Sequence, residues 1–247
     1  MNAHVNQLGQ PIGFAMPNWQ PRPRPPRDAI DGRFCRLELF DPDRHCAELF
    51  DAFAEDKEGR TWTYLAYGPF ASLEQFRDLM QAHFFGQDPL CHIIIDRTSG
   101  RAAGMASYMR IDPAMGSIEV GSIAYSPRLQ KSRAATETMY LMMRRAFDEL
   151  GYRRYEWKCD ALNAPSRQAA ERLGFRFEGI FRQAVVYKCR NRDTAWYSII
   201  DREWPALKQV FERWLDASNF DAEGRQRESL SVLTRAALER ATGAAAE

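Results

Sequence analysis

The chain has 247 residues, of which 45% are hydrophobic and 27% are charged, and its formal net charge is +1. This length can bury the core of one or two domains, and the near-neutral charge argues against nucleic acid or an anionic membrane as a partner. No apolar run is long enough to span a bilayer, and no apolar block marks a signal peptide, so we expect a cytoplasmic protein.

Residues 1–30 form an N-terminal arm that is rich in proline and arginine. Its prolines favour extended or polyproline-like backbone over helix or sheet. Two interpretations stay open. The arm lies on the surface of the domain, or its arginines (Arg22, Arg24 and Arg27) meet phosphates or a partner subunit. Nucleic-acid binding through the arm would require the second interpretation.

The first part of the domain combines one strand with two helices. Residues 34–40 alternate apolar and polar side chains, which predicts a half-buried strand. After an Asp-Pro-Asp helix start, residues 45–54 are predicted to be helical. The aromatic stretch at 61–70 ends in a Gly-Pro pair and is expected to be a loop. Residues 72–75 resemble a capping box and open a second helix that ends near Phe85.

Short strands and one long helix follow. Residues 91–96 and 102–111 predict a hairpin, and Ser117–Tyr125 predicts the next strand. Apolar residues then recur at helical spacing over residues 139–150 and form one continuous face. Gly151 stands where a glycine commonly ends a helix.

The remaining elements predict the fold class. Residues 152–159 are a further strand and 163–173 a further helix, and 175–187 and 194–200 complete the strands. This order predicts a mixed α/β sheet with helices on both faces. Residues 203–215 and 225–241 are predicted to be helical, in a tail that packs on the domain or on a second subunit of a homodimer. We divide the chain into the arm at 1–30, a domain at 31–205 and a helical C-terminal extension at 206–247.

The cysteines and histidines predict neither disulfides nor a metal site. The five cysteines are scattered and form no CxxC pair, which is typical of free thiols in a reducing compartment. The four histidines lack ligand-like spacing, so we expect no bound metal.

The junction between the strand Ser117–Tyr125 and the long helix carries the first chemical signal. A strand, loop and helix in this order point free backbone N–H groups and the positive end of the helix dipole at one place. Such a place can bind a pyrophosphate. Ala134 and Ala135 would let an anion approach the backbone, and Lys131 and Arg133 would add positive charge. The alternative is an ordinary capped helix.

The run Gln130-Lys131-Ser132-Arg133-Ala134-Ala135 resembles the pyrophosphate loop of the GNAT acyltransferase superfamily, Gln/Arg-x-x-Gly-x-Gly/Ala. Arg133 replaces the middle glycine of that pattern. Because a residue with a Cβ atom resists left-handed backbone, we expect the loop to wrap an anion less closely there.

Further motifs resemble the RimJ/RimL branch of that superfamily, the acetyltransferases of ribosomal-protein N-termini and their relatives. The resemblance extends over residues 34–205 and keeps the motifs in order. The motifs are Glu119-Val120-Gly121, Asn163-Ala164-Pro165-Ser166, Leu173-Gly174-Phe175, Glu178-Gly179, Asp193, Trp196-Tyr197-Ser198 and Glu203-Trp204.

The resemblance implies a GNAT-like, mostly antiparallel central sheet and an acyl-CoA-dependent N-acyltransferase. The acyl donor is expected to be acetyl-CoA or another short-chain acyl-CoA, and the acceptor a small amine or a protein N-terminus that attacks the thioester directly. The rival hypothesis is a catalytically silent acyl-CoA-binding or scaffold protein, which the replacement by Arg133 favours.

The resemblance also assigns roles to single residues. Glu119 is the candidate base for the amine, or else a salt-bridged strand glutamate, with Asp160 and His92 as weaker alternatives. Ser166 is the candidate donor to the leaving thiolate, or else a first-turn serine that satisfies a backbone donor. Family members often carry a tyrosine where this chain has Ala170.

The expected binding residues fall into two groups. Those for the cofactor are Ile123, Ala124, Tyr125, Gln130, Lys131, Ser132, Arg133, Ala134, Ala135, Thr136, Asn163 and Ser166. Those for the acceptor are Trp62, Tyr64, Tyr67 and Glu119, where the aromatic residues form either a substrate wall or core packing.

Overall fold

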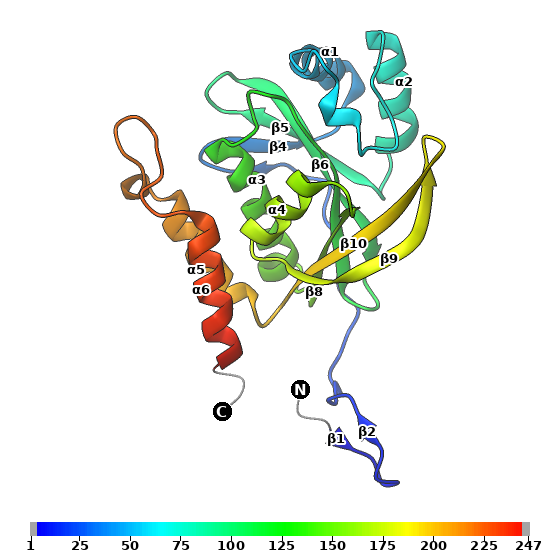
Figure 1. Ribbon diagram of the computed structural model, residues 1–247, viewed down its shortest axis with the longest axis vertical. Helices are drawn as coiled ribbons and strands as arrows, with labels where there is room; N and C mark the ends of the chain where they lie inside the picture. Colours follow the sequence, from blue (N-terminus) through cyan, green and yellow to red (C-terminus); the bar gives the residue numbers. More distant parts are fainter. Residues whose placement is uncertain (1–3, 244–247) are drawn as a thin grey trace.

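The computed structural model describes residues 4–243 and contains one eight-stranded sheet (Figure 1). The strand order is β3-β4-β5-β6-β7-β8-β10-β9, and every neighbouring pair is antiparallel except β7 and β8. The strands are β3 (Ile30–Asp31), β4 (Cys35–Leu39), β5 (Leu90–Asp96), β6 (Arg101–Asp112), β7 (Ser117–Tyr125), β8 (Arg154–Asp160), β9 (Arg176–Tyr187) and β10 (Arg190–Ile200). The prediction of a mixed, mostly antiparallel sheet is confirmed.

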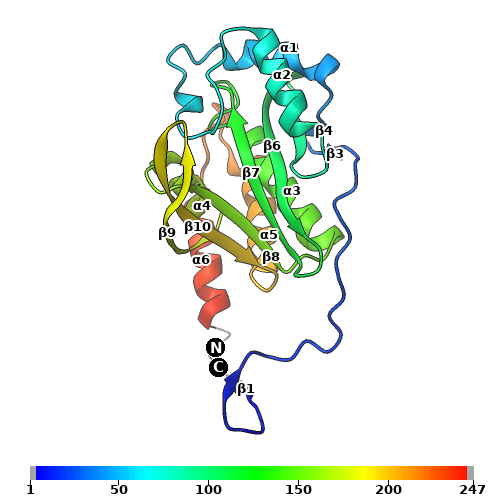
Figure 2. The same ribbon diagram turned by 90° about the vertical axis from the view of Figure 1, so that its right-hand side faces the viewer.

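Helices cover both faces of the sheet, as predicted. On one face, α1 (Pro42–Phe53) and α2 (Leu73–Phe84) pack over β4, β5 and β6 and enclose a small core around Phe76 and Met80. On the other face, α3 (Arg133–Arg144), α4 (Ala164–Arg172) and α5 (Trp204–Leu215) enclose the larger core. The helices over β4, β5 and β6 leave the same face of β8, β10 and β9 uncovered (Figure 2).

Side chains fix the helix starts that the sequence predicted. Asp41 accepts hydrogen bonds from the N–H groups of Asp43 and Arg44 at the start of α1. Ser72 accepts from the N–H of Gln75 at the start of α2. These short polar side chains satisfy backbone donors that have no partner within the helix.

The long helix changes its winding before it ends. The α-helix stops at Arg144 and continues as a π-helix, η2 (Arg145–Glu149), where the N–H of Leu150 donates to the carbonyl of Arg145. The prediction of one regular helix to residue 150 is therefore wrong in its last turn. An apolar face tolerates one wide turn because the following side chains, such as Phe147, still reach the core.

The C-terminal helix α6 (Leu230–Gly243) starts five residues later than predicted, because residues 220–229 form an ordered loop. The side chain of Asp221 accepts from the N–H groups of Glu223 and Arg225. Gly224 has a φ of 77°. Local side-chain bonds of this kind compete with helical hydrogen bonds.

The arm is not wholly extended. Its start forms a small hairpin of β1 (His4–Val5) and β2 (Pro11–Ile12), which lies apart from the domain in Figures 1 and 2. The side chain of Asn6 accepts from the N–H groups of Leu8 and Gln10, and this turn chemistry overrides the proline-rich composition. Within residues 4–243, no helix is long and apolar enough to cross a membrane.

Candidate active site

The parallel strands β7 and β8 form a fork in the sheet. They pair only over Ser117–Val120 and then separate. The cause lies in Ser122, whose φ is 48°, at a register shift where β7 has one residue more than β6. A bulge of this kind bends its strand. The edge of β7 that faces β8 therefore has no strand partner beyond Val120 in the described chain.

The bulge also reverses the side-chain alternation of β7. Unbroken alternation from Glu119 would place Ile123 on the same face as Glu119, but the structure places it on the other face. Ile123 packs against the core under α3, whereas Ala124 lies in the core under α1 and α2. Side chains of a strand alternate between its two faces, so one extra residue moves every later side chain to the opposite face.

The backbone of β7 still presents donors to the fork. Ser126 donates its N–H to the carbonyl of Ala103 on β6 at 3.0 Å. By alternation, the N–H of Ala124 also points to β6, and those of Ile123 and Tyr125 point into the fork. All three residues were expected to bind the cofactor. Ile123 and Tyr125 offer a backbone donor to the fork, and Ala124 does not.

The loop after β7 leads into a helix start that is capped and still has free donors. Ser132 accepts a hydrogen bond from the N–H of Ala135 at 3.0 Å. The N–H groups of Lys131, Arg133 and Ala134 have no acceptor among residues 4–243. The structure thus combines both interpretations of this segment: a cap on one donor and three donors that remain for a ligand.

The loop backbone differs from our expectation at the replaced glycine. The left-handed residue is Lys131, with a φ of 59°, and Arg133 is not among the residues with positive φ. Arg133 is the first residue of α3 and takes ordinary helical backbone. Its Cβ atom therefore causes no backbone strain at this position.

Other side chains of the loop are held by the protein itself. Gln130 donates from Nε2 to the carbonyl of Tyr125 at 3.0 Å. The hydroxyl of Thr136 accepts from Arg172 at 3.2 Å. Ala134 and Ala135 are buried. Gln130 and Thr136 therefore shape the loop, and the exposed Lys131 has no ion-pair partner in the described chain.

The start of α4 forms the other side of the fork. Asn163 caps this helix by accepting from the N–H of Ser166 at 3.2 Å. The hydroxyl of Ser166 accepts from Trp157 Nε1 at 3.0 Å, so its own proton can go to another acceptor. Burial raises the pKa of the nearby Cys159 thiol, although Ser166 opposes that shift. Ala170 is fully buried.

On the opposite face of the sheet, Glu119 lies in a buried charge cluster. One carboxylate oxygen is 2.7 Å from Arg110 Nη1, and the other is 2.9 Å from Lys158 Nζ. Lys158 also lies 2.7 Å from Glu156 Oε2 and 3.7 Å from the ring centroid of Trp196. Glu119 therefore has the contacts of a salt-bridged strand glutamate.

The two weaker candidates for the base are bound or inaccessible. Asp160 accepts from the N–H of Leu162 and from the hydroxyl of Tyr187, both at 2.8 Å. His92 is fully buried, and burial lowers its pKa to about 4, which leaves it neutral. His92 thus cannot contact an acyl-acceptor substrate in this conformation.

The aromatic loop divides between core and surface. Trp62 is 5% exposed and packs on Phe53 and Phe70, so it is a core residue. Burial raises the pKa of Tyr67, and Ser122 of the bulge opposes that shift. Tyr64 donates its hydroxyl to the carbonyl of Leu162, at the turn before α4.

The tip of the β9–β10 hairpin reaches this loop, which the sequence did not predict. Lys188 donates to the carbonyl of Trp62 at 2.7 Å, and Arg190 donates to that of Thr63 at 3.1 Å. The tip of the hairpin thus lies against the aromatic loop. The only sequence signal for this hairpin was the short gap between its two strands. The two residues in that gap, Lys188 and Cys189, both have left-handed backbone conformation.

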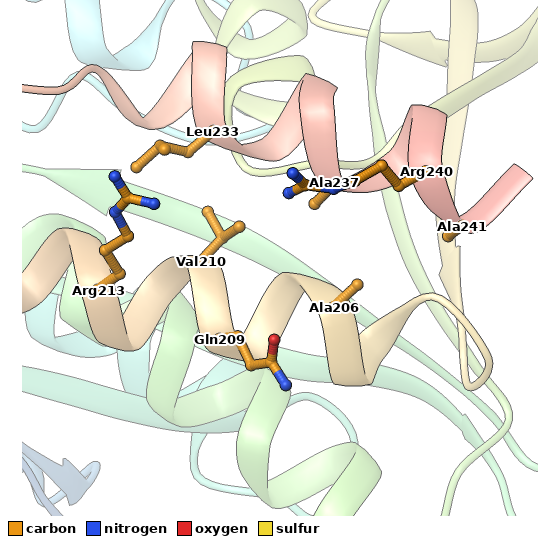
Figure 3. Close-up of a pocket in the computed structure, with 8 residues that line it drawn as sticks. All are labelled: Ala206, Gln209, Val210, Arg213, Leu233, Ala237, Arg240 and Ala241. Carbon is orange, nitrogen blue, oxygen red and sulfur yellow. The ribbon is translucent and has the colours of Figure 1, made fainter. Parts of the chain in front are cut away.

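A separate cavity of about 470 Å³ lies between α5 and α6 (Figure 3). Its walls are apolar at Val210, Leu233 and Ala237, and Arg213 and Arg240 stand at its sides. None of the residues that line it belongs to the fork, so we do not include it in the site. Within residues 4–243 no group of three or more His, Cys, Asp or Glu residues is placed to hold a metal ion.

Comparisons with known proteins agree with this geometry. The model of the acetyltransferase (GNAT) domain matches residues 36–176, which is more than half of the chain. A crystal structure of a GCN5-related N-acetyltransferase from Brucella melitensis is 48% identical, with a TM-score of 0.87 over 89% of this chain and 100% of that one. A probable acetyltransferase (GNAT family) from Chromobacterium violaceum is 40% identical, with a TM-score of 0.74 over 79% of this chain and 98% of that one.

A curated relative matches over a shorter stretch. The uncharacterized N-acetyltransferase YnaD of Bacillus subtilis is 27% identical over 86 residues, which are 35% of this chain and 50% of the relative. The matched stretch thus spans half the length of that relative. From the family model and the two structures, we conclude that the chain belongs to the GNAT acetyltransferase family.

Proposed function

We propose that the protein transfers an acyl group, in the first place acetyl, from coenzyme A to an amine. The observation that carries this proposal is the fork between β7 and β8, which has unpaired donors on its strand edge and at the adjoining start of α3. Family membership supplies the reaction class.

The residues present fit an acyl-CoA. The free N–H groups of Lys131, Arg133 and Ala134 suit its phosphates, because a helix start attracts anions. The N–H groups of Ile123 and Tyr125 suit the amide and thioester carbonyls. When bound, the cofactor supplies an acyl group activated as a thioester.

Ser166 is the proposed donor to the sulfur that leaves. Trp157 fixes its hydroxyl oxygen and leaves its proton free, and Asn163 fixes the backbone around it. A positioned hydroxyl of this kind lowers the cost of the developing thiolate charge.

Glu119 remains the proposed base for the amine proton, because an amine attacks only when it is neutral. Its ion pairs with Arg110 and Lys158 compete with this role, since they occupy both carboxylate oxygens. The acceptor is proposed to be a small amine or a protein N-terminus that approaches along the face carrying Glu119, Tyr67 and Tyr64. Membership of the RimJ/RimL branch is likewise part of this proposal.

A turnover assay tests the proposal. Purified protein, acetyl-CoA and a panel of polyamines, amino acids and N-terminal peptides are incubated, and CoA release and acylated product are followed by mass spectrometry. We expect steady CoA release with at least one amine. Tight CoA binding without turnover on the whole panel would instead indicate the catalytically silent protein, and absence of CoA binding would refute the proposal.

A further inference from the structure

Two arginines beside the start of α3 have no carboxylate partner in the part of the chain that the structure describes. Arg133 stacks its guanidinium 4.0 Å from the ring centroid of Phe220 and 5.5 Å from that of Phe34. Arg172, at the end of α4, stacks 5.1 Å from the ring centroid of Trp214. Within residues 4–243, its only side-chain hydrogen bond is to the neutral hydroxyl of Thr136.

Neighbouring arginines, unlike these two, have carboxylate partners. Arg176 pairs with Glu203, and the buried Arg145 pairs with Asp28. Arg133 and Arg172 are only partly exposed, and partial burial lowers the pKa of Arg172. A partly desolvated cation gains more from an anionic ligand than a fully hydrated one does.

The two arginines lie on one side of α3. Arg133 and Thr136 are three residues apart on the same helix, so their side chains are neighbours. The bond from Arg172 to Thr136 therefore brings the second guanidinium to the side where Arg133 emerges. This side adjoins the free N–H groups of Arg133 and Ala134.

Two of the three stacking rings belong to the C-terminal extension, and these two contact each other. Trp214 of α5 and Phe220 lie edge to face, with ring centroids 5.2 Å apart. Trp214 donates from Nε1 to Gln226 at 2.9 Å, and the buried Asn219 donates to the carbonyls of Trp214 and Glu228. This network fixes the aromatic pair in an ordered loop.

We propose that the Trp214–Phe220 pair positions Arg133 and Arg172 to bind the phosphate groups of acyl-CoA. Stacking holds the plane of a guanidinium and leaves its N–H edge free for a second ligand. The C-terminal extension is then part of the cofactor site, and Arg133 in place of the loop glycine is a ligand fixed from outside the loop. This inference rests on the proposed function.

Calorimetric titration with CoA tests the inference. Arg133→Met and Arg172→Met should each raise the Kd for CoA about tenfold, because each removes a charged bond to phosphate. Phe220→Leu should raise it about threefold by releasing Arg133, and Phe220→Tyr, which keeps the ring, should restore the wild-type value. The double variant Arg133→Met/Phe220→Leu should bind no more weakly than Arg133→Met alone.

A matched control comes from the other end of α3. Arg144 lies 5.9 Å from the ring centroid of Tyr140 and 3.8 Å from a carboxylate oxygen of Glu149, so it is a stacked arginine far from the helix start that already has an acidic partner. Arg144→Met should leave the Kd for CoA unchanged. Pantetheine, which lacks phosphates, should bind all variants equally in an NMR titration.

The outcomes separate this inference from the proposed function. If the wild-type protein does not bind CoA, the proposed function itself fails. If the wild-type protein binds CoA and the Kd is unchanged in Arg133→Met, Arg172→Met and Phe220→Leu, the inference is wrong. Additive effects of Arg133→Met and Phe220→Leu would also overturn it, because Phe220 would then act on stability and not through Arg133.

Discussion

At the scale of single residues, Ser166 shows how one side chain can serve structure and chemistry together. Its backbone N–H donates to the side chain of the cap residue Asn163, and its hydroxyl oxygen accepts from Trp157 Nε1. Both contacts fix the position of the hydroxyl and use none of its donor capacity. From the sequence we considered that the Ser166 hydroxyl satisfies a backbone donor; in the structure Asn163 caps the helix, and the hydroxyl proton of Ser166 stays available.

Ser166→Ala should therefore lower kcat about tenfold or more and leave the Kd for CoA within about twofold, because the lost interaction acts mainly on the developing thiolate. Steady-state kinetics and calorimetry measure the two quantities. Trp157→Phe, which removes the donor to Ser166 together with part of the buried ring, serves as the comparison and should lower kcat less. An unchanged kcat in Ser166→Ala would remove Ser166 from the reaction.

At the scale of elements, the fork depends on the bulge at Ser122 and on a charged contact across the two strands that it separates. Glu119 on β7 and Glu156 on β8 are register partners, and like charges at such positions repel. Lys158 lies within 3 Å of both carboxylates and joins the strands near the end of their paired stretch.

Glu119→Gln should lower the free energy of unfolding by about 3 kcal/mol, because it removes one of the two carboxylates that pair with the buried Lys158. If Glu119 is also the base, kcat should fall by about a hundredfold or more. Denaturant unfolding and kinetics are measured together. The control is Glu156→Gln, which removes the other carboxylate of Lys158. Equal losses of kcat in both variants would assign Glu119 a structural role only.

At the scale of the whole molecule, the N-terminal arm lies along the domain over much of its length (Figure 2). Trp19 donates from Nε1 to the carbonyl of Ala114 at 2.8 Å, and Arg22 donates its N–H to that of Pro113 at 2.9 Å. Arg27 reaches the carbonyl of Gly86. These contacts favour the interpretation of the arm as a surface segment, because its arginines bond to the domain.

Trp19→Ala should lower the free energy of unfolding by about 1 kcal/mol and make the arm easier to cleave by a protease, since the arm loses its main contact. Gly116→Ala should have the same effect. Its φ is 64°, and an added Cβ would lie 2.4 Å from the Trp19 ring. Gly13→Ala is the matched control, because nothing lies within 4 Å of an added Cβ there. Equal cleavage of all three variants and the wild-type protein would contradict this account.

The sequence predicted the elements well because periodicity and capping are local. Ser117–Tyr125 is a strand, and Asp41, Ser72 and Asn163 cap the helices that follow them. The motifs also predicted the family. Local pattern could not predict the bulge at Ser122, because a bulge is defined by the partner strand.

The sequence by itself thus determined a mixed sheet, its helices and the segments that meet at the fork. Only the tertiary structure decided which groups are free there. Glu119 gains two cations from other strands, and Arg133 gains a ring from the C-terminal extension. Outside the bulge at Ser122, the backbone conformation of these elements follows from neighbours in sequence, whereas the partners of a charge follow from neighbours in space.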